Sequence, residues 1–210
     1  MSLYDVIAAG HRGQCFGLLA RRFMIGEQQA ALAVRHLLPV LLPSFEAWAS
    51  APGGLPAFLD AMNRGGYEKS LSSPAVFTNH FERDRGIQLL LQFRAAREID
   101  GGDITQAVDG SGVTHRVLVQ MLPYVALLLM AGLRATTEAP FRDILARRLG
   151  ANRIRSPNPF GELADLIDWE SKGQHGGMLA GVLDALFGRR GSSPAPRLGA
   201  MAGSASASPG

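Results

Sequence analysis

The densest group of side chains that could do chemistry lies at residues 77–84, which read Phe-Thr-Asn-His-Phe-Glu-Arg-Asp. Here His80 precedes two nearby carboxylates, Glu82 and Asp84. An imidazole beside carboxylates can serve as a general base or help to hold a metal ion. The polarity of a surface loop explains the same residues. His80, Glu82 and Asp84 therefore form a candidate metal or catalytic cluster, with a solvated loop as the alternative.

The remaining candidates for chemistry favour structural interpretations. Glu98, Asp100 and Asp103 surround a Gly-Gly pair but do not have the spacing of an EF-hand loop, so a solvated turn is expected. The single cysteine, Cys15, lies in an apolar stretch and is expected to be a small buried hydrophobe. The sequence contains no phosphate-binding loop, dinucleotide fingerprint, nucleophile elbow or HExxH motif. These patterns predict no cofactor and favour a protein that is not an enzyme.

The charge distribution argues against nucleic-acid binding. The chain carries 21 basic and 18 acidic residues, for a net charge of +3. Its arginines cluster once, and the cluster is followed by a run of acids that could pair with it inside the chain. No helix-turn-helix pattern accompanies the cluster. The two groups are Arg142, Arg147, Arg148, Arg153 and Arg155, and then Glu162, Asp165, Asp168 and Glu170.

The last apolar segment, residues 178–187, is the strongest candidate for binding a partner. At helical spacing it presents one broad apolar face, and Arg189 and Arg190 follow it. This face could fold back on the core, dock on another subunit or protein, or lie on an anionic membrane surface. The face consists of Met178, Leu179, Val182, Leu183, Leu186 and Phe187.

The element around which the chain is organised is residues 113–135, its most apolar run. Its uncharged part, residues 117–133, is shorter than the roughly 20 residues of a membrane span and includes Gln120 and Pro123. A buried central helix is therefore preferred over membrane contact. We expect Pro123 to kink or interrupt this helix.

The rest of the pattern predicts an all-α fold, because no segment shows the alternation of a strand. Apolar residues recur at helical spacing over most of the chain, and glycine, proline and serine mark the turns between them. An offset of 84 residues aligns the segment around Pro39 with that around Pro123, which suggests two related helical units or a chance similarity. Helices are expected at residues 3–9, 14–23, 27–48, 55–62, 86–99, 104–108, 138–149, 160–169 and 178–187.

We expect three parts: a helical domain at residues 1–135, C-terminal amphipathic helices with a basic linker at 136–188, and a disordered tail at 189–210. The tail is rich in Gly, Ser, Ala and Pro, a composition that cannot build a core. The first residues lack the basic start of a signal peptide. A single cysteine also suits a reducing compartment, so a cytoplasmic location is expected.

With these residues in place, the chain resembles the YidB-like family, a bacterial family of unknown function. The resemblance covers residues 1–135 and the last apolar segment, and it is carried more by the order of the motifs than by any one of them. It departs at residues 89–97, where that family has a Gly-rich segment with a histidine. The motifs are Leu-Tyr-Asp-Val-Ile at 3–7, Gly-Leu-Leu-Ala-Arg-Arg-Phe at 17–23, Leu-Leu-Pro at 37–39, Pro-Gly-Gly-Leu at 52–55, Val-Gln-Met-Leu-Pro at 119–123 and Leu-Met-Ala-Gly-Leu at 129–133.

The resemblance implies a small helical bacterial protein and supplies no catalytic residues. Together with the excess of apolar helix faces, it favours a protein that acts through contacts with other proteins, including copies of itself. The alternatives are a peripheral membrane protein that uses the last helix, and an enzyme or metal binder near His80.

Overall fold

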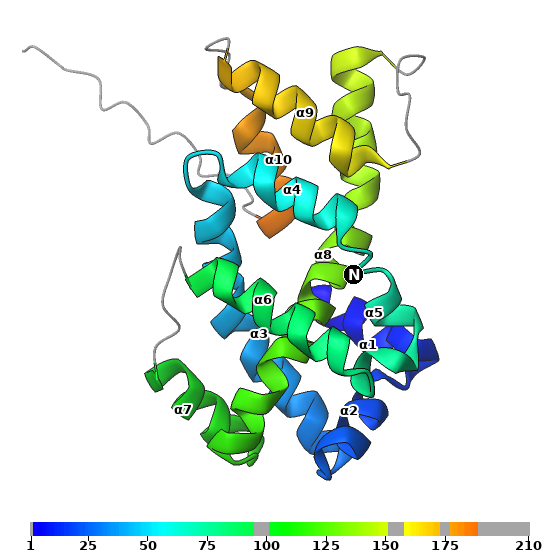
Figure 1. Cartoon of the computed structure of the whole chain (residues 1–210), viewed down its shortest axis with the longest axis vertical. Helices are drawn as coiled ribbons and strands as arrows, with labels where there is room; N and C mark the ends of the chain where they lie inside the picture. Colours follow the sequence, from blue (N-terminus) through cyan, green and yellow to red (C-terminus); the bar gives the residue numbers. More distant parts are fainter. Residues whose placement is uncertain (1, 95–100, 151–157, 173–176, 189–210) are drawn as a thin grey trace, which may run out of the picture.

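The computed structural model describes residues 2–94, 101–150, 158–172 and 177–188, and within these ranges it contains helices and no strand. The all-α prediction is confirmed (Figure 1). The predicted tail at 189–210 and linker residues 151–157 lie outside the described residues. The elements are α1 (Leu3–Gly13), α2 (Cys15–Phe23), α3 (Glu27–Ser50), α4 (Gly54–Arg64), α5 (Lys69–Ser72), the 3-10 turn η1 (Pro74–Phe77), α6 (His80–Arg94), α7 (Gly101–Ser111), α8 (His115–Leu149), α9 (Pro159–Lys172) and α10 (Gly177–Phe187).

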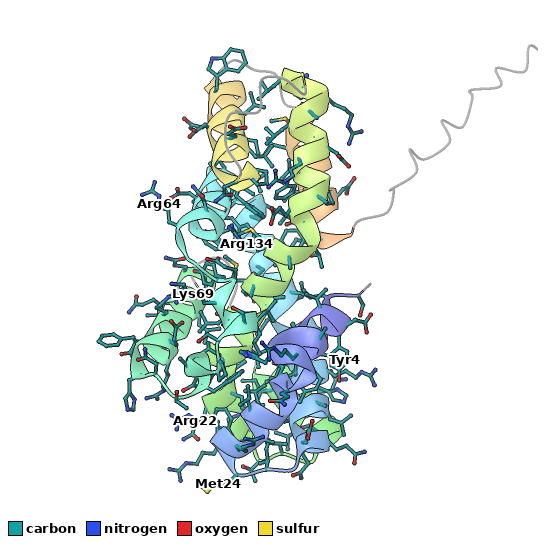
Figure 2. The ribbon with its side chains drawn as sticks, turned by 90° about the vertical axis from the view of Figure 1, so that its right-hand side faces the viewer. Tyr4, Arg22, Met24, Arg64, Lys69 and Arg134 are labelled. Carbon is teal, nitrogen blue, oxygen red and sulfur yellow. The ribbon has the colours of Figure 1, made fainter. Side chains whose placement is uncertain are left out.

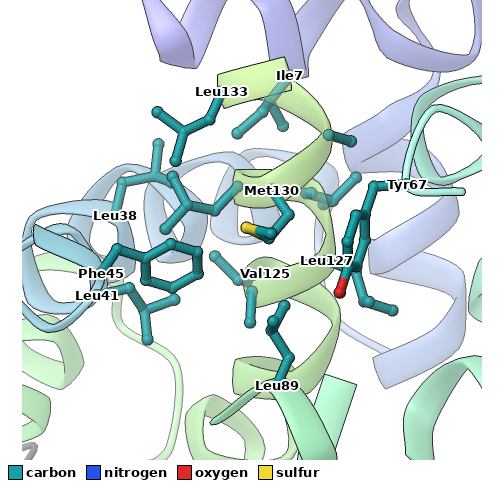
Figure 3. Close-up of a cluster of buried hydrophobic side chains, with 14 of the residues drawn as sticks. Ile7, Leu38, Leu41, Phe45, Tyr67, Leu89, Val125, Leu127, Met130 and Leu133 are labelled. Atoms are coloured by element: carbon teal, nitrogen blue, oxygen red, sulfur yellow. The ribbon is translucent and has the colours of Figure 1, made fainter. Parts of the chain in front are cut away.

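Helix α8 is the central helix that the apolar run predicts. Every residue from 121 to 133 is buried. Figure 3 shows how its side chains meet those of other elements: Val125 lies between Phe45 of α3 and Leu89 of α6, while Leu127 lies beside Tyr67. Apolar residues all around the helix are expected only when neighbours cover every side of it. The predicted burial of this segment is confirmed.

The expected end of the central helix near residue 135 is wrong, because α8 continues to Leu149. It passes through Pro123 and Pro140 without leaving helix. After Leu133 the chain turns polar, a pattern that predicted a break there. Instead, the hydroxyl of Thr137 donates to the carbonyl of Leu133 at 2.6 Å, and that of Thr136 donates to the carbonyl of Gly132 at 3.0 Å. Threonine can bond back to the preceding turn in this way while the helix goes on.

The long helix α8 runs the length of the molecule, α3 runs from one end as far as α4, and the shorter helices cover them (Figure 1). Around one end lie α1, α2, α6 and α7, which pack against α3 or α8. Around the other lie α4, α9 and α10, with α9 against α4 and α8, and α10 against α3 and α8. The order short, short, long occurs in α1 to α3 and again in α6 to α8. A common origin of these two units stays a prediction.

By length and composition α3 and α8 could each cross a membrane. In this fold the most apolar window of α8 is 78% buried and that of α3 is 44% buried. The core of a soluble protein and a membrane span pass the same test of composition, so this test does not distinguish them.

Candidate functional site

Most of the predicted interaction face on α10 is covered by the chain itself. Met178, Val182 and Leu186 are no more than 4% exposed, and Leu183 and Phe187 are half-buried. The Phe187 ring lies 6.2 Å from that of Phe58 in α4. Folding back, one of the three alternatives for this face, thus accounts for five of its six residues. Leu179 remains, with 38% of its surface exposed.

Leu179 borders an apolar hollow between α9, α10 and the turn that joins α3 to α4. This hollow has a volume of about 370 Å³. Leu183 and Ile167 form its inner walls, while Leu55, Pro52 and Pro56 form the side toward the turn. Trp169 follows directly after two lining residues, Ile167 and Asp168, and it is 72% exposed. Trp169 is not itself among the residues that line the hollow. An apolar hollow with an exposed leucine among its lining residues is a candidate interaction site.

Helix α9, which positions Ile167 and Trp169, is held by its buried face. Phe160 packs edge-on against Phe141 of α8 with ring centroids 5.4 Å apart, and the Arg134 guanidinium lies 4.7 Å from the Phe160 centroid. At its start the side-chain oxygen of Asn158 accepts a bond from the Phe160 amide at 3.1 Å, which caps the helix. The side chain of Asn158 also donates to Asn63 of α4. These contacts fix the position of α9, which forms one wall of the hollow.

The candidate cluster at His80 is dispersed along α6. His80 and Asp84 are exposed, whereas Glu82 is half-buried and pairs with Arg85 at 2.6 Å. Arg85 also donates to the carbonyl of Gly65 and lies over the Tyr67 ring at 5.4 Å. Residues two apart on a helix point to different sides, so His80 and Glu82 do not converge. In the described ranges no three His, Cys, Asp or Glu side chains are grouped as metal ligands would be.

The other polar candidates have structural surroundings. Cys15 is fully buried, and burial raises the pKa of its thiol to about 12, which disfavours the reactive thiolate. Asp103 lies in the first turn of α7, while Asp100 is outside the described residues.

The arginine cluster pairs at least in part along α8 itself. Arg142 binds Glu138 at 2.9 Å, and Arg147 donates to the carbonyl of Asp143 at 3.2 Å. Arg153 and Arg155 lie outside the described residues. The prediction that the chain does not bind nucleic acid stays a prediction.

A buried histidine is the feature that the sequence analysis missed. The Nε2 atom of His11 lies 3.0 Å from the Ser70 carbonyl, and its ring centroid is 5.3 Å from that of Phe77. His11 and Arg12 have φ of 54° and 59°, where α1 changes direction before α2. The flanking Gly10 and Gly13 signalled a break between helices, but nothing local indicated that the histidine points inward.

Comparisons with known proteins identify no relative of this chain. No family model, no curated protein and no solved structure matches the chain. The resemblance to the YidB-like family, carried by the motifs quoted above, therefore stays a prediction.

Proposed function

We propose that this chain is a non-enzymatic helical protein of the YidB-like type that acts through protein contacts, and that the hollow bordered by Leu179 binds a second copy of the chain. The observation that carries the proposal is an apolar hollow with the exposed Leu179 among its lining residues, in a chain that also exposes Trp169 on the adjoining helix α9. Tryptophan is among the residues that contribute most to protein interfaces.

Self-association is supported by the presence of an apolar hollow and an exposed tryptophan in the same chain. In a twofold dimer each residue that enters the partner also receives the equivalent residue in return. Trp169 of one copy would enter the hollow lined by Leu179 and Leu183 of the other, and the reverse contact would form at the same time. A hollow of about 370 Å³ has room for one aromatic side chain.

The test is the molar mass of the purified chain, measured by light scattering at increasing concentration. We expect the mass to rise from 22.4 kDa toward that of a dimer. Trp169→Ser and Leu179→Asp should each keep the mass at the monomer value, because they remove the inserted ring and the apolar wall. Both positions are exposed, so both variants should fold.

Met24→Ser is the matched control. Met24 is 93% exposed and lies at the end of the molecule opposite α9 (Figure 2). This variant should associate as the natural chain does. A natural chain that stays monomeric at every concentration would contradict the proposal. Sedimentation with anionic lipid vesicles that Leu179→Asp abolishes would instead support a membrane surface as the partner.

A further inference from the structure

A second apolar hollow lies between α6, α7 and α8, and it belongs to neither the predicted sites nor the surface at α10. Its volume is about 440 Å³, within the range of roughly 300–1,000 Å³ found for ligand pockets. Ile87, Leu90 and Leu91 of α6 form one wall. Val119 and Pro123 of α8 form the other, and Ile104 of α7 lies at one side.

The hollow is bounded by a close approach of two helices. A Cβ atom added to Gly86 would lie 2.3 Å from the carbonyl oxygen of Pro123, so α6 and α8 touch here backbone to backbone. Pro123 has no amide hydrogen, and the carbonyl of Val119 therefore lacks the helical donor that it would otherwise have. This carbonyl belongs to a residue that lines the hollow.

The walls of this hollow are aliphatic and open to solvent. Leu91 is 51% exposed and Val119 is 41% exposed, although both are large apolar residues. Among the described residues that line it, Arg83 is the one with a formal charge, and Gln120 adds an amide. Neither carboxylate adjacent to Arg83 in the sequence neutralises this site: Glu82 pairs with Arg85, and Asp84 lines a different hollow beside Tyr67.

We propose that this hollow between α6, α7 and α8 binds an aliphatic carboxylate of medium chain length. The alkyl chain would lie between Leu91 and Val119, and the carboxylate would bind the guanidinium of Arg83. Arginine matches a carboxylate with two parallel hydrogen bonds. The absence of aromatic and acidic side chains among the described lining residues favours a flexible alkyl chain and an anionic head group over a planar or cationic ligand.

The test is calorimetric titration of the full chain with octanoate, decanoate, decanol and decyltrimethylammonium, all below their micelle concentrations. Decanoate has two more methylene groups than octanoate and should bind about 15-fold more tightly, since each buried methylene contributes roughly fourfold. Decanol and the cationic chain should bind at least about fivefold more weakly than decanoate. Equal affinity for all head groups, or no binding at all, would overturn the proposal.

Matched variants locate the ligand. Arg83→Gln should weaken decanoate about fivefold and leave decanol unchanged, whereas Arg21→Gln, at an exposed arginine of α2, should change neither. Val119→Asp should abolish binding of both chains. If the Val119→Asp variant still binds decanoate, the ligand does not bind in this hollow. Leu179→Asp should leave decanoate binding intact, so this inference and the proposed dimer fail or succeed separately.

Discussion

At the scale of single residues, His11 combines a buried imidazole with a backbone conformation that few residues adopt. Its Nδ1 atom and the Oγ atom of Ser70 are buried, and neither has a hydrogen-bond partner. Burial lowers the pKa of His11, and its bond to the Ser70 carbonyl opposes this only in part. The folded protein therefore favours a neutral His11 that is bonded to the backbone of α5 at Ser70.

This arrangement predicts a pH dependence of stability. Because the pKa of His11 is lower in the folded than in the unfolded chain, the unfolded chain binds more protons. Stability from the neutral ring is complete above the unfolded value near 6.5 and falls as the pH drops below it. Urea unfolding at pH 7.5 and 5.5 should show a smaller loss in His11→Asn than in the natural chain. Asparagine tolerates the positive φ of this position.

The comparison needs a control for the loss of a histidine as such. His80→Asn removes an exposed histidine from α6 and should leave the difference between the two pH values as in the natural chain. A His11→Asn variant with the full pH dependence of the natural chain would show that other groups cause it.

At the scale of elements, the contact between α6 and α8 depends on a glycine. Gly86 lets the α6 backbone reach Pro123, and Leu89, one turn further on, is 2% exposed in the core. The apolar pattern predicted a helix that begins at residue 86, which placed Gly86 at a boundary. The structure begins α6 at His80, which puts the glycine inside the helix, where only close packing explains it.

Replacing Gly86 by alanine should lower the free energy of unfolding by more than the higher helix propensity of alanine raises it. Gly86→Ala forces a Cβ atom against the carbonyl of Pro123, and we expect a loss of about 1–3 kcal/mol in the free energy of unfolding. Gly181→Ala, at an exposed position of α10, meets nothing within 4 Å and should gain about 0.5–1 kcal/mol. Urea unfolding measures both. Equal effects in the two variants would refute the close contact.

At the scale of the whole molecule, the segment after residue 135 is built into the core. α8 continues through the expected boundary at residue 135, and α9 and α10 bury Phe160, Leu163 and Val182 completely. These helices cover the outer half of α8 and the inner face of α4.

A chain that ends at Gly150 should therefore lose cooperative unfolding. It would expose apolar faces of α4 and α8, and each large side chain that loses its cover costs about 1.5–3 kcal/mol. Several such losses together would equal a large part of the free energy of unfolding of a typical domain, which is about 5–15 kcal/mol. A chain that ends at Gly188 keeps every described helix and should melt cooperatively in calorimetry. A sharp melting transition in the shorter chain would show instead that residues 1–150 fold on their own.

The sequence by itself determined the helical class, the buried central helix and the apolar face of α10, because each is a local pattern of about 3.6-residue period. It also indicated the breaks at Gly10 and at Pro52. Which faces cover one another depends on the tertiary structure: Val182 is buried while Leu179 and Trp169 are exposed, and Gly86 meets Pro123. These features depend on contacts between residues far apart in the chain. A periodic pattern shows that a helix face is apolar but does not show which other face packs against it.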